Sequence, residues 1–287
     1  LSAHAKLNLL LRLGTKRSDG YHEIASVFQS ISLADELTIA LGSSGRVTME
    51  LSGLSVTSGP NNLAVQAAEL FCRRVGRREG THIRLEKQIP IGRGLGGGSA
   101  DAAAVLVGLN LLCDSPIPEN ELTALGAEIG SDVPFCIRGG TAVCTGRGEV
   151  MKTLPSQSHA FVIINPSFGV STKWAYQAWD RAPDGSAPKL AQDGSLEWAS
   201  HLAENDFERV VFPQHPILQK WKSLLVERGA IAAGLSGSGS ALFGIFHTRH
   251  DAERVAALFA REGVQTFVAE SVPKGVEVWK PSLSAER

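Results

Sequence analysis

The sequence lacks the features that mark several specialised classes of protein. It has no excess of charge of one sign, because 28 lysines and arginines stand against 29 aspartates and glutamates, a formal net charge of −1. This balance offers no basic surface to nucleic acid, so an anionic ligand must be held by a local arrangement of residues. No apolar run approaches the length of a membrane span, and polar residues interrupt Leu1–Leu13, so we expect no signal peptide, anchor or membrane partner.

Cysteine is scarce, and its spacing matches none of the usual zinc patterns. The four cysteines, Cys72, Cys113, Cys136 and Cys144, stand far apart in apolar surroundings. We expect them to be reduced core residues of a cytoplasmic protein rather than disulfide partners or metal ligands.

The richest local signal is a cluster of glycines within Pro90–Asp101. Five of the seven residues in Gly92–Gly98 are glycine. Residues 81–86 before it alternate polar and apolar side chains, as a half-buried strand does, and the apolar run 101–113 after it predicts a buried helix that Ser99 would cap. A strand, a glycine loop and a helix N-terminus bring free backbone N–H groups and the positive helix dipole to one point. We therefore predict a cradle for a nucleotide phosphate.

Two familiar nucleotide motifs fit this cluster poorly. Gly92, Gly94 and Gly97 satisfy the dinucleotide pattern G-x-G-x-x-G, which also requires an acidic residue at the end of a second strand about 20 residues on. Asp114 has that spacing, but it follows a predicted helix. A Walker A loop is excluded because no Gly-Lys-Ser/Thr follows the glycines. A flexible connecting loop is the non-functional alternative.

The order of the predicted elements favours an α+β protein over a regular βαβ repeat. With 287 residues and 43% hydrophobic content, the chain suits one large or two modest domains, and because Leu1 is not a start methionine we expect a few residues to precede it. Residues 181–195 read as a surface loop, and the alternation that follows predicts a split βαβ sandwich. Strands are predicted at 6–13, 22–33, 37–41, 46–51, 81–86, 141–145, 161–164, 230–235, 241–247 and 264–270, and helices at 62–75, 101–113, 119–129, 194–204, 214–228 and 250–262.

Four further features each have an ordinary structural interpretation beside a functional one. Lys6 lies in an apolar strand and is either an outward-facing charge at the edge of a sheet or a functional group. Asp132 precedes Val-Pro, a position where aspartate often caps a helix, and is either such a cap or a functional carboxylate. Leu235–Ser240 is a glycine-serine turn that would join two strands or give further donors to a phosphate. Tyr21 and His22 follow a turn. They are either ordinary surface residues or a pair that stacks on a base and hydrogen-bonds to it.

Taken together, these segments resemble the GHMP kinase superfamily. Pro90–Ser99 resembles its central phosphate-binding motif, and Gly237–Ser240 its third motif. Within the superfamily, nearly the whole chain resembles the diphosphocytidyl-methylerythritol kinases. The segments that carry this likeness are Ala5–Leu9, Asp19–Glu23, Gly92–Ser99, Gly130–Pro134 and Leu235–Ser240.

The resemblance implies a two-domain GHMP kinase fold, with an ATP-binding domain like the second domain of ribosomal protein S5 at 1–155 and a ferredoxin-like domain at 156–287. It implies ATP and Mg²⁺ as cofactors and a cytidine diphosphate conjugate of methylerythritol as the substrate, phosphorylated at its C2 hydroxyl. Asp132 matches the catalytic base, and Lys6 the lysine paired with it. The implied ATP-binding residues are Asn62, Lys87, Pro90, Gly92, Gly94, Leu95, Gly96, Gly97, Gly98, Ser99, Gly237, Ser238 and Gly239, and the implied substrate-binding residues are Asn8, Tyr21, His22, Thr172 and Tyr176.

The chain departs from the family pattern at Ala100, where a second serine often follows the glycines. No carboxylate is assigned to a metal, so Mg²⁺ would be held by ATP oxygens and water. The alternatives are another GHMP kinase of the homoserine or mevalonate type, a non-catalytic nucleotide-binding protein on the same fold and, more distantly, a nicotinamide oxidoreductase.

Overall fold

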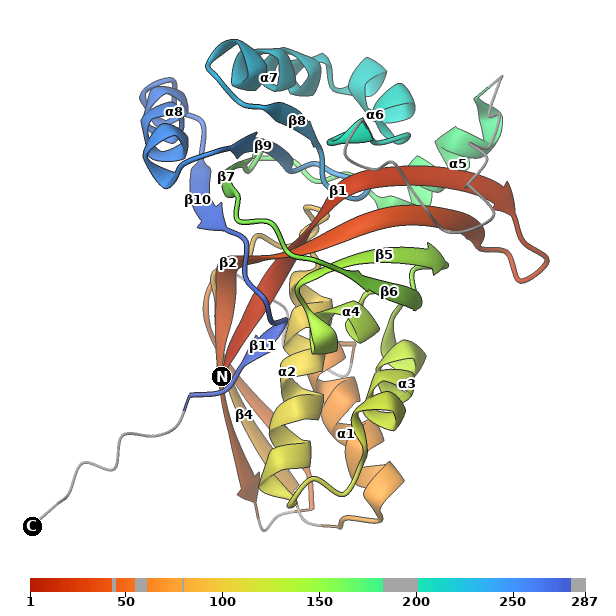
Figure 1. Cartoon of the computed structure of the whole chain (residues 1–287). Helices are drawn as coiled ribbons and strands as arrows, with labels where there is room; N and C mark the ends of the chain where they lie inside the picture. The colour runs from red at the N-terminus through yellow and green to blue at the C-terminus, as the bar shows by residue number, and fades with distance from the viewer. Residues whose placement is uncertain (43–44, 55–60, 79, 183–200, 280–287) are drawn as a thin grey trace, which may run out of the picture.

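The computed structural model describes residues 1–42, 45–54, 61–78, 80–182 and 201–279, which form two β-sheets, each packed with helices (Figure 1). No helix in these ranges is long and apolar enough to cross a membrane. The strands are β1 (Ser2–Lys16), β2 (His22–Gly42), β3 (Val47–Gly53), β4 (Gly80–Lys87), β5 (Thr141–Gly146), β6 (Val150–Leu154), β7 (Ala160–Ile164), β8 (Ala232–Leu235), β9 (Leu242–Phe246), β10 (Thr266–Glu270) and β11 (Val276–Glu277). The helices are α1 (Leu63–Val75), α2 (Gly97–Leu112), α3 (Glu119–Ile129), α4 (Val133–Arg138), α5 (Thr172–Arg181), α6 (Glu208–Gln214), α7 (Pro216–Glu227) and α8 (Arg249–Arg261).

A long hairpin of β1 and β2 organises the larger sheet. Its strand order is β11-β1-β2-β4-β3, and β5 pairs with β2 and then with β6. The first part of β2 pairs with β5 and its last part with β4. The sequence predicted two strands here, at 22–33 and 37–41, and that prediction is wrong. The strand runs on because the buried Asp35 carboxylate accepts hydrogen bonds from the N–H groups of Gln88 and Ile89, so a polar residue does not end it.

The smaller sheet has the order β10-β7-β9-β8 and is antiparallel throughout. β7, the first of these strands along the chain, lies between β10 and β9, the last and the third. This order confirms the predicted split βαβ sandwich. Helix α7 packs against β8 and β9, and α8 packs against β7 and β10. After β10 the chain returns to the larger sheet, where β11 pairs with β1 (Figure 1). The domain boundary at 155/156 stays a prediction.

Several predicted elements need correction. Ser99 does not cap α2, because the helix starts at Gly97 and the residue before it, Gly96, has a left-handed backbone with a φ of 71°. Serine after a run of glycines resembles a cap, but here the glycine makes the turn into the helix. The predicted helix 194–204 and the loop 181–195 lie mostly outside the described residues, and 201–204 form a turn. The sequence did not predict β6, α4, α5, α6 or β11.

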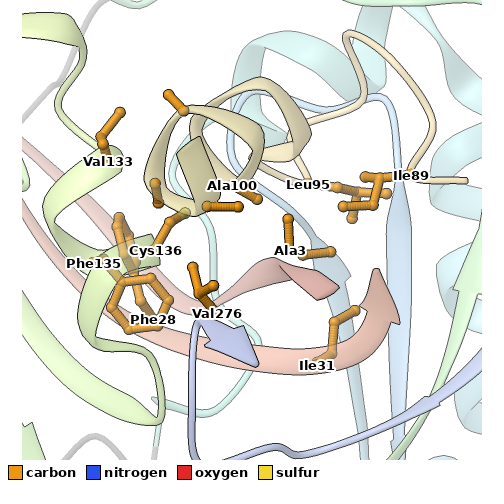
Figure 2. Packing of buried hydrophobic residues seen from close by; sticks show 14 of the residues in the cluster. Ala3, Phe28, Ile31, Ile89, Leu95, Ala100, Val133, Phe135, Cys136 and Val276 are labelled. Atoms are coloured by element: carbon orange, nitrogen blue, oxygen red, sulfur yellow. The ribbon is translucent and has the colours of Figure 1, made fainter. Parts of the chain in front are cut away.

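The main core lies between the larger sheet and its helices. Figure 2 shows side chains from α2 and α4 packed over β1 and β2, with the rings of Phe28 and Phe135 edge to face at 5.1 Å. The buried face of α2 carries a run of alanines, and their small side chains bring the helix close to the sheet. The four cysteine thiols are free, but only Cys136 and Cys144 are buried. Burial raises the pKa of Cys144 to about 12, so this thiol is inert at neutral pH.

Candidate active site

Two adjoining cavities lie at the N-terminus of α2. The first, of about 700 Å³, is lined by the glycine loop and brings together Asn62, Lys87 and Thr172. The second, of about 340 Å³, is lined by Lys6, Asn8, Tyr21, His22, Asp132, Tyr176, Gly237 and Ser238. Gly94, Gly96, Ser99 and Thr172 line both, so a ligand in one cavity can meet a ligand in the other. Of the predicted ATP-binding residues, Gly239 lines neither cavity.

The glycine loop packs closely against two other parts of the site. Gly94 has a φ of 79°, and a Cβ atom there would lie 2.0 Å from the carbonyl oxygen of Ser236. Ser236 belongs to the glycine-serine turn Leu235–Ser240, which is called the second glycine loop below. At Gly96 a Cβ atom would lie 2.8 Å from Cγ of Lys6. By helix geometry, the N–H groups of the first turn of α2 have no acceptor within the helix. The loop therefore leaves these donors and the positive helix end at the cavity, an arrangement suited to an anion.

Lys6 and Asp132 form an ion pair in the second cavity, and Lys6 lies against Gly96, which lines both cavities. Lys6 Nζ lies 3.2 Å from Oδ2 of Asp132 and donates a 2.7 Å hydrogen bond to Oδ1 of Asn8. The Asn8 amide in turn donates to Oγ of Ser26, which holds it in place. Lys6 is only 4% exposed, and its ammonium lies 4.8 Å from the centre of the Phe28 ring. Lys6 is therefore not a solvated edge charge.

Asp132 stands at the N-cap position of α4, where the sequence allowed a purely structural role. Its side chain makes no capping hydrogen bond. The carboxylate is directed instead to Lys6, and 31% of the side chain is exposed, so it can be reached from the cavity. The local helix geometry thus leaves this carboxylate free to accept a proton.

An aromatic wall closes the far side of the second cavity. The His22 and Tyr176 rings stack at 5.0 Å with 19° between their planes, and Tyr176 meets Phe207 edge to face. Burial raises the pKa of Tyr176 to about 12. Of the two rings that follow the turn, His22 rather than Tyr21 is the one on which Tyr176 stacks. Tyr21 is 54% exposed, with the Arg147 guanidinium 5.0 Å from its ring centre.

Asp180 is a neighbour of the site that sequence reasoning missed. Its carboxylate lies 2.7 Å from Nε2 of His22 and 2.9 Å from Nζ of Lys16. The hydrogen bond from Lys16, followed by that from His22, lowers the pKa of Asp180. This leaves Nδ1 as the His22 nitrogen open to a ligand. No short-range pattern links α5 to the start of β2, so nothing in the sequence indicated this contact.

Lys87 lies on the floor of the first cavity, between two buried carboxylates. Its ammonium pairs with Asp35 and lies 2.7 Å from Oδ2 of Asp101. Burial raises the pKa of Asp101 to about 8, against the opposing pull of the Lys87 charge. Oδ1 of Asp101 has no hydrogen-bond partner among the described residues. Lys87 was among the residues predicted from the sequence to bind ATP, whereas Asp35 and Asp101 were not predicted to lie at the site.

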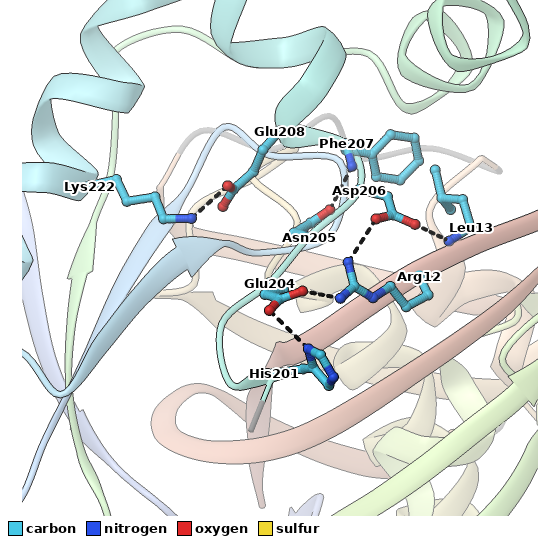
Figure 3. A network of polar contacts seen from close by, with 9 residues as sticks. All are labelled: Arg12, Leu13, His201, Glu204, Asn205, Asp206, Phe207, Glu208 and Lys222. Carbon is cyan, nitrogen blue, oxygen red and sulfur yellow. Dashed lines mark hydrogen bonds and ion pairs between the residues drawn. The ribbon is translucent and has the colours of Figure 1, made fainter. Parts of the chain in front are cut away.

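The second glycine loop joins β8 and β9 and is fixed to β1 by the segment 203–206. Asn205 donates hydrogen bonds to the carbonyl oxygens of Leu235 and Gly237 at 2.7 and 2.8 Å. Figure 3 shows Arg12 of β1 between the carboxylates of Glu204 and Asp206, the second at 3.0 Å. This network holds Gly237 beside Asn8. Next to the loop, Ser238 hydrogen-bonds Thr172 at 2.8 Å.

The described residues offer no ready-made metal centre. They contain no group of three or more histidines, cysteines, aspartates or glutamates that could hold a metal ion. The two carboxylates at the cavities, Asp101 and Asp132, each pair with a lysine. Ala100 packs in the hydrophobic core beneath the loop (Figure 2) and lines neither cavity. A metal ion here would depend on ligand oxygens and water.

Two regions of the chain match known protein-family models. Residues 62–140 match the GHMP kinases N terminal domain, and residues 187–265 match the GHMP kinases C terminal domain. The 4-diphosphocytidyl-2-C-methyl-D-erythritol kinase of Gloeobacter violaceus is 42% identical, over 96% of this chain and 95% of that protein. A crystal structure of 4-(cytidine 5'-diphospho)-2C-methyl-D-erythritol kinase aligns with a TM-score of 0.80 and 35% identity, covering 94% of this chain and 98% of that one.

A more distant structure shares the fold alone. The homoserine kinase of Cytophaga hutchinsonii aligns with a TM-score of 0.65 over 96% of both chains, at 19% identity.

Proposed function

The chain belongs to the 4-diphosphocytidyl-2-C-methyl-D-erythritol kinase family of the GHMP kinases, and on this premise we propose that it phosphorylates the C2 hydroxyl of 4-diphosphocytidyl-2-C-methyl-D-erythritol. It has the two-domain GHMP kinase fold and is an ATP-dependent phosphotransferase with an alcohol acceptor. The observation that carries the proposal is the ion pair of Lys6 and Asp132 in the smaller cavity, beside Gly96, which lines both cavities.

Asp132 is the general base of the proposed reaction. It takes the proton of the C2 hydroxyl while that oxygen bonds to the γ-phosphorus and the bond from the γ-phosphorus to the β,γ-bridging oxygen breaks, releasing ADP. Lys6 pairs with the Asp132 carboxylate and offsets charge that develops on the transferred group. Asn8 holds the Lys6 ammonium through its 2.7 Å hydrogen bond.

ATP occupies the larger cavity in this account. Its triphosphate lies against the glycine loop and the N-terminus of α2, whose backbone N–H groups donate to phosphate oxygens. Gly237 and Ser238 line the adjoining smaller cavity and approach the glycine loop from there, and Asn62 and Lys87 lie toward the adenine. Mg²⁺ bound to ATP would neutralise phosphate charge. Among the described residues of the two cavities, both carboxylates are paired with a lysine, so phosphate oxygens and water would be its ligands.

The acceptor occupies the smaller cavity, with its cytosine against the wall of His22 and Tyr176. Nδ1 of His22 is available to the edge of the base because Nε2 is engaged by Asp180. Tyr21 lies at the rim, and Thr172 stands where the two cavities meet. A homoserine or mevalonate kinase has no use for a base-binding wall beside its catalytic pair, so the position of His22 near Asp132 favours the cytidylylated acceptor.

One reaction tests this proposal. The full chain is incubated with ATP, Mg²⁺ and 4-diphosphocytidyl-2-C-methyl-D-erythritol, and the product is followed by ³¹P NMR. We expect a new phosphomonoester signal coupled to C2, with the diphosphate signals retained, and no such signal with Asp132→Asn on the same timescale. ATP binding without any phosphoryl transfer would favour the non-catalytic alternative and contradict the proposal.

A further inference from the structure

The nucleotide cavity is poor in positive charge that a phosphate could use. Among the described residues that line it, only Lys87, Arg93 and Asp101 have ionisable side chains. The Lys87 ammonium is already held by Asp35 and Asp101, both buried. Its charge is therefore compensated within the protein before any ligand arrives. Apart from the bound metal and Lys6, which pairs with Asp132 in the adjoining cavity, the charge of the ATP phosphates is left to backbone N–H groups and to Arg93.

Arg93 differs from Lys87 in having no carboxylate partner among the described residues. Its Nε donates a 3.1 Å hydrogen bond to Oδ1 of Asn165, in the segment after β7. Asn165 is itself fixed, because its side-chain amide donates to Oε1 of Gln265 at 2.7 Å. The two terminal NH₂ groups of Arg93 have no hydrogen-bond partner within the described ranges. The guanidinium is thus oriented by its inner nitrogen while its outer donors stay open.

The guanidinium lies at the side of the cavity formed by the second half of the chain. A Cβ atom on Gly169 would lie 2.6 Å from Nη1 of Arg93, which places the outer nitrogens beside the segment that leads into α5. Thr172, at the start of α5, lines the same cavity. Arg93 therefore lines the cavity beside the segment that leads into α5, and it is the one described lining residue whose positive charge has no carboxylate partner.

We propose that Arg93 binds a phosphate group of the nucleotide through its outer guanidinium nitrogens, in addition to the backbone donors of α2. This inference rests on the proposed function, since it takes ATP as the ligand of the larger cavity. An arginine fork matches phosphate oxygens in pairs, and such charge-assisted hydrogen bonds are about twice as strong as neutral ones. The alternative role is a tether that only joins the glycine loop to the segment containing Asn165.

Direct binding measurements separate these roles. The Kd values of a non-hydrolysable ATP analogue and of adenosine are measured by calorimetry for the full chain and for Arg93→Gln, Arg93→Lys and Asn165→Ala. We expect Arg93→Gln to weaken binding of the ATP analogue by about 10- to 100-fold and to reduce the salt dependence of that Kd. Adenosine, which lacks phosphate, should bind all four proteins alike. Arg93→Lys should recover part of the loss because it keeps the charge.

The control is Asn165→Ala, which removes the tether and keeps the guanidinium. Its Kd for the ATP analogue should stay within about threefold of the unmodified chain. An unchanged Kd in folded Arg93→Gln, or an equal loss in Asn165→Ala, would overturn the inference. If the unmodified chain bound no ATP analogue at all, the proposed function itself would fail, which is a distinct result.

Discussion

Nζ of Lys6 lies 3.2 Å from Oδ2 of Asp132, and the two residues come from a central strand and from the start of a short helix. Neither side chain has an ordinary structural role that explains the contact. Lys6 is buried in a sheet and is not a solvated surface charge, and Asp132 does not cap its helix. A buried ammonium and a reachable carboxylate in the cavity that adjoins the glycine loop form a unit suited to proton abstraction.

The first prediction concerns this pair. Asp132→Asn should lower kcat by about 10²–10⁴, the usual contribution of a general base, and leave ATP affinity nearly unchanged. Lys6→Ala should have a similar effect, and the double variant should lose much less than the product of the two, because the residues act together. Loss of thermal stability with retained turnover in Asp132→Asn would instead support the helix-cap interpretation.

The second prediction concerns the backbone of the glycine loop. Gly96→Val should weaken ATP binding strongly, because Gly96 has a positive φ and a Cβ atom there meets Lys6 at 2.8 Å. Gly98→Ala is the matched control, since its Cβ atom would meet only Leu63 at an ordinary 3.5 Å. Circular dichroism establishes folding, and titration with an ATP analogue gives the Kd. Equal affinities in folded Gly96→Val and Gly98→Ala would contradict the close-approach argument.

The third prediction concerns the dependence of stability on pH. The pKa of Asp101 rises from 3.8 to about 8 in the folded protein, mainly through burial. Between these values the folded state holds a proton that the unfolded state has lost, so this group's contribution to stability declines as pH rises from about 4 to 8. Asp101→Asn cannot ionise and should flatten this decline.

Thermal melts across that pH range measure the effect. Asp114→Asn is the control, because Asp114 is exposed and lies outside the buried cluster. Its melting temperatures should follow those of the unmodified chain. A decline as steep in Asp101→Asn as in the unmodified chain would show that Asp101 titrates normally.

The fourth prediction concerns the base-binding wall. His22→Ala should lower kcat/KM for the cytidylylated acceptor by roughly tenfold or more, because it removes both a stacking surface and a hydrogen-bonding edge. Tyr21→Ala should also lower it, and both variants should keep their ATP affinity. Asp180→Asn should act through the orientation of His22 and raise KM more than it lowers kcat. Steady-state kinetics with each substrate varied in turn distinguish these effects, and an equal rise in KM for ATP would argue against a separate acceptor wall.

Local sequence patterns were sufficient to predict the glycine loop, most strands and helices, and the sandwich in the second half. Each depends on neighbours in the chain: alternation marks β4, glycines mark the loop, and an apolar run marks α2. The same patterns misplaced the start of α2, since a serine that resembles a cap lies inside the first turn. The resemblance to a kinase family, rather than periodicity, singled out Lys6 and Asp132.

The contacts that the sequence did not reveal join residues distant along the chain. Lys87 meets Asp35 and Asp101 only after three elements pack together, and His22 meets Asp180 only when α5 folds against the start of β2. Such pairs cannot be recognised from hydrophobic periodicity, because the periodicity of each segment indicates only its own helix or strand and not its distant partner. The role proposed for Arg93 was not predicted for another reason. Arg93 lies among glycines, and the glycines alone were enough to predict a phosphate-binding loop.

The most direct test of the account is a comparison of acceptors with the unmodified chain. The values of kcat/KM are measured with saturating ATP for 4-diphosphocytidyl-2-C-methyl-D-erythritol, methylerythritol phosphate, homoserine and mevalonate. We predict that the cytidylylated compound is by far the best substrate and that methylerythritol phosphate without the cytidine is very poor, because the wall beside His22 then has nothing to bind. A higher kcat/KM for any of the other three would contradict the proposed substrate.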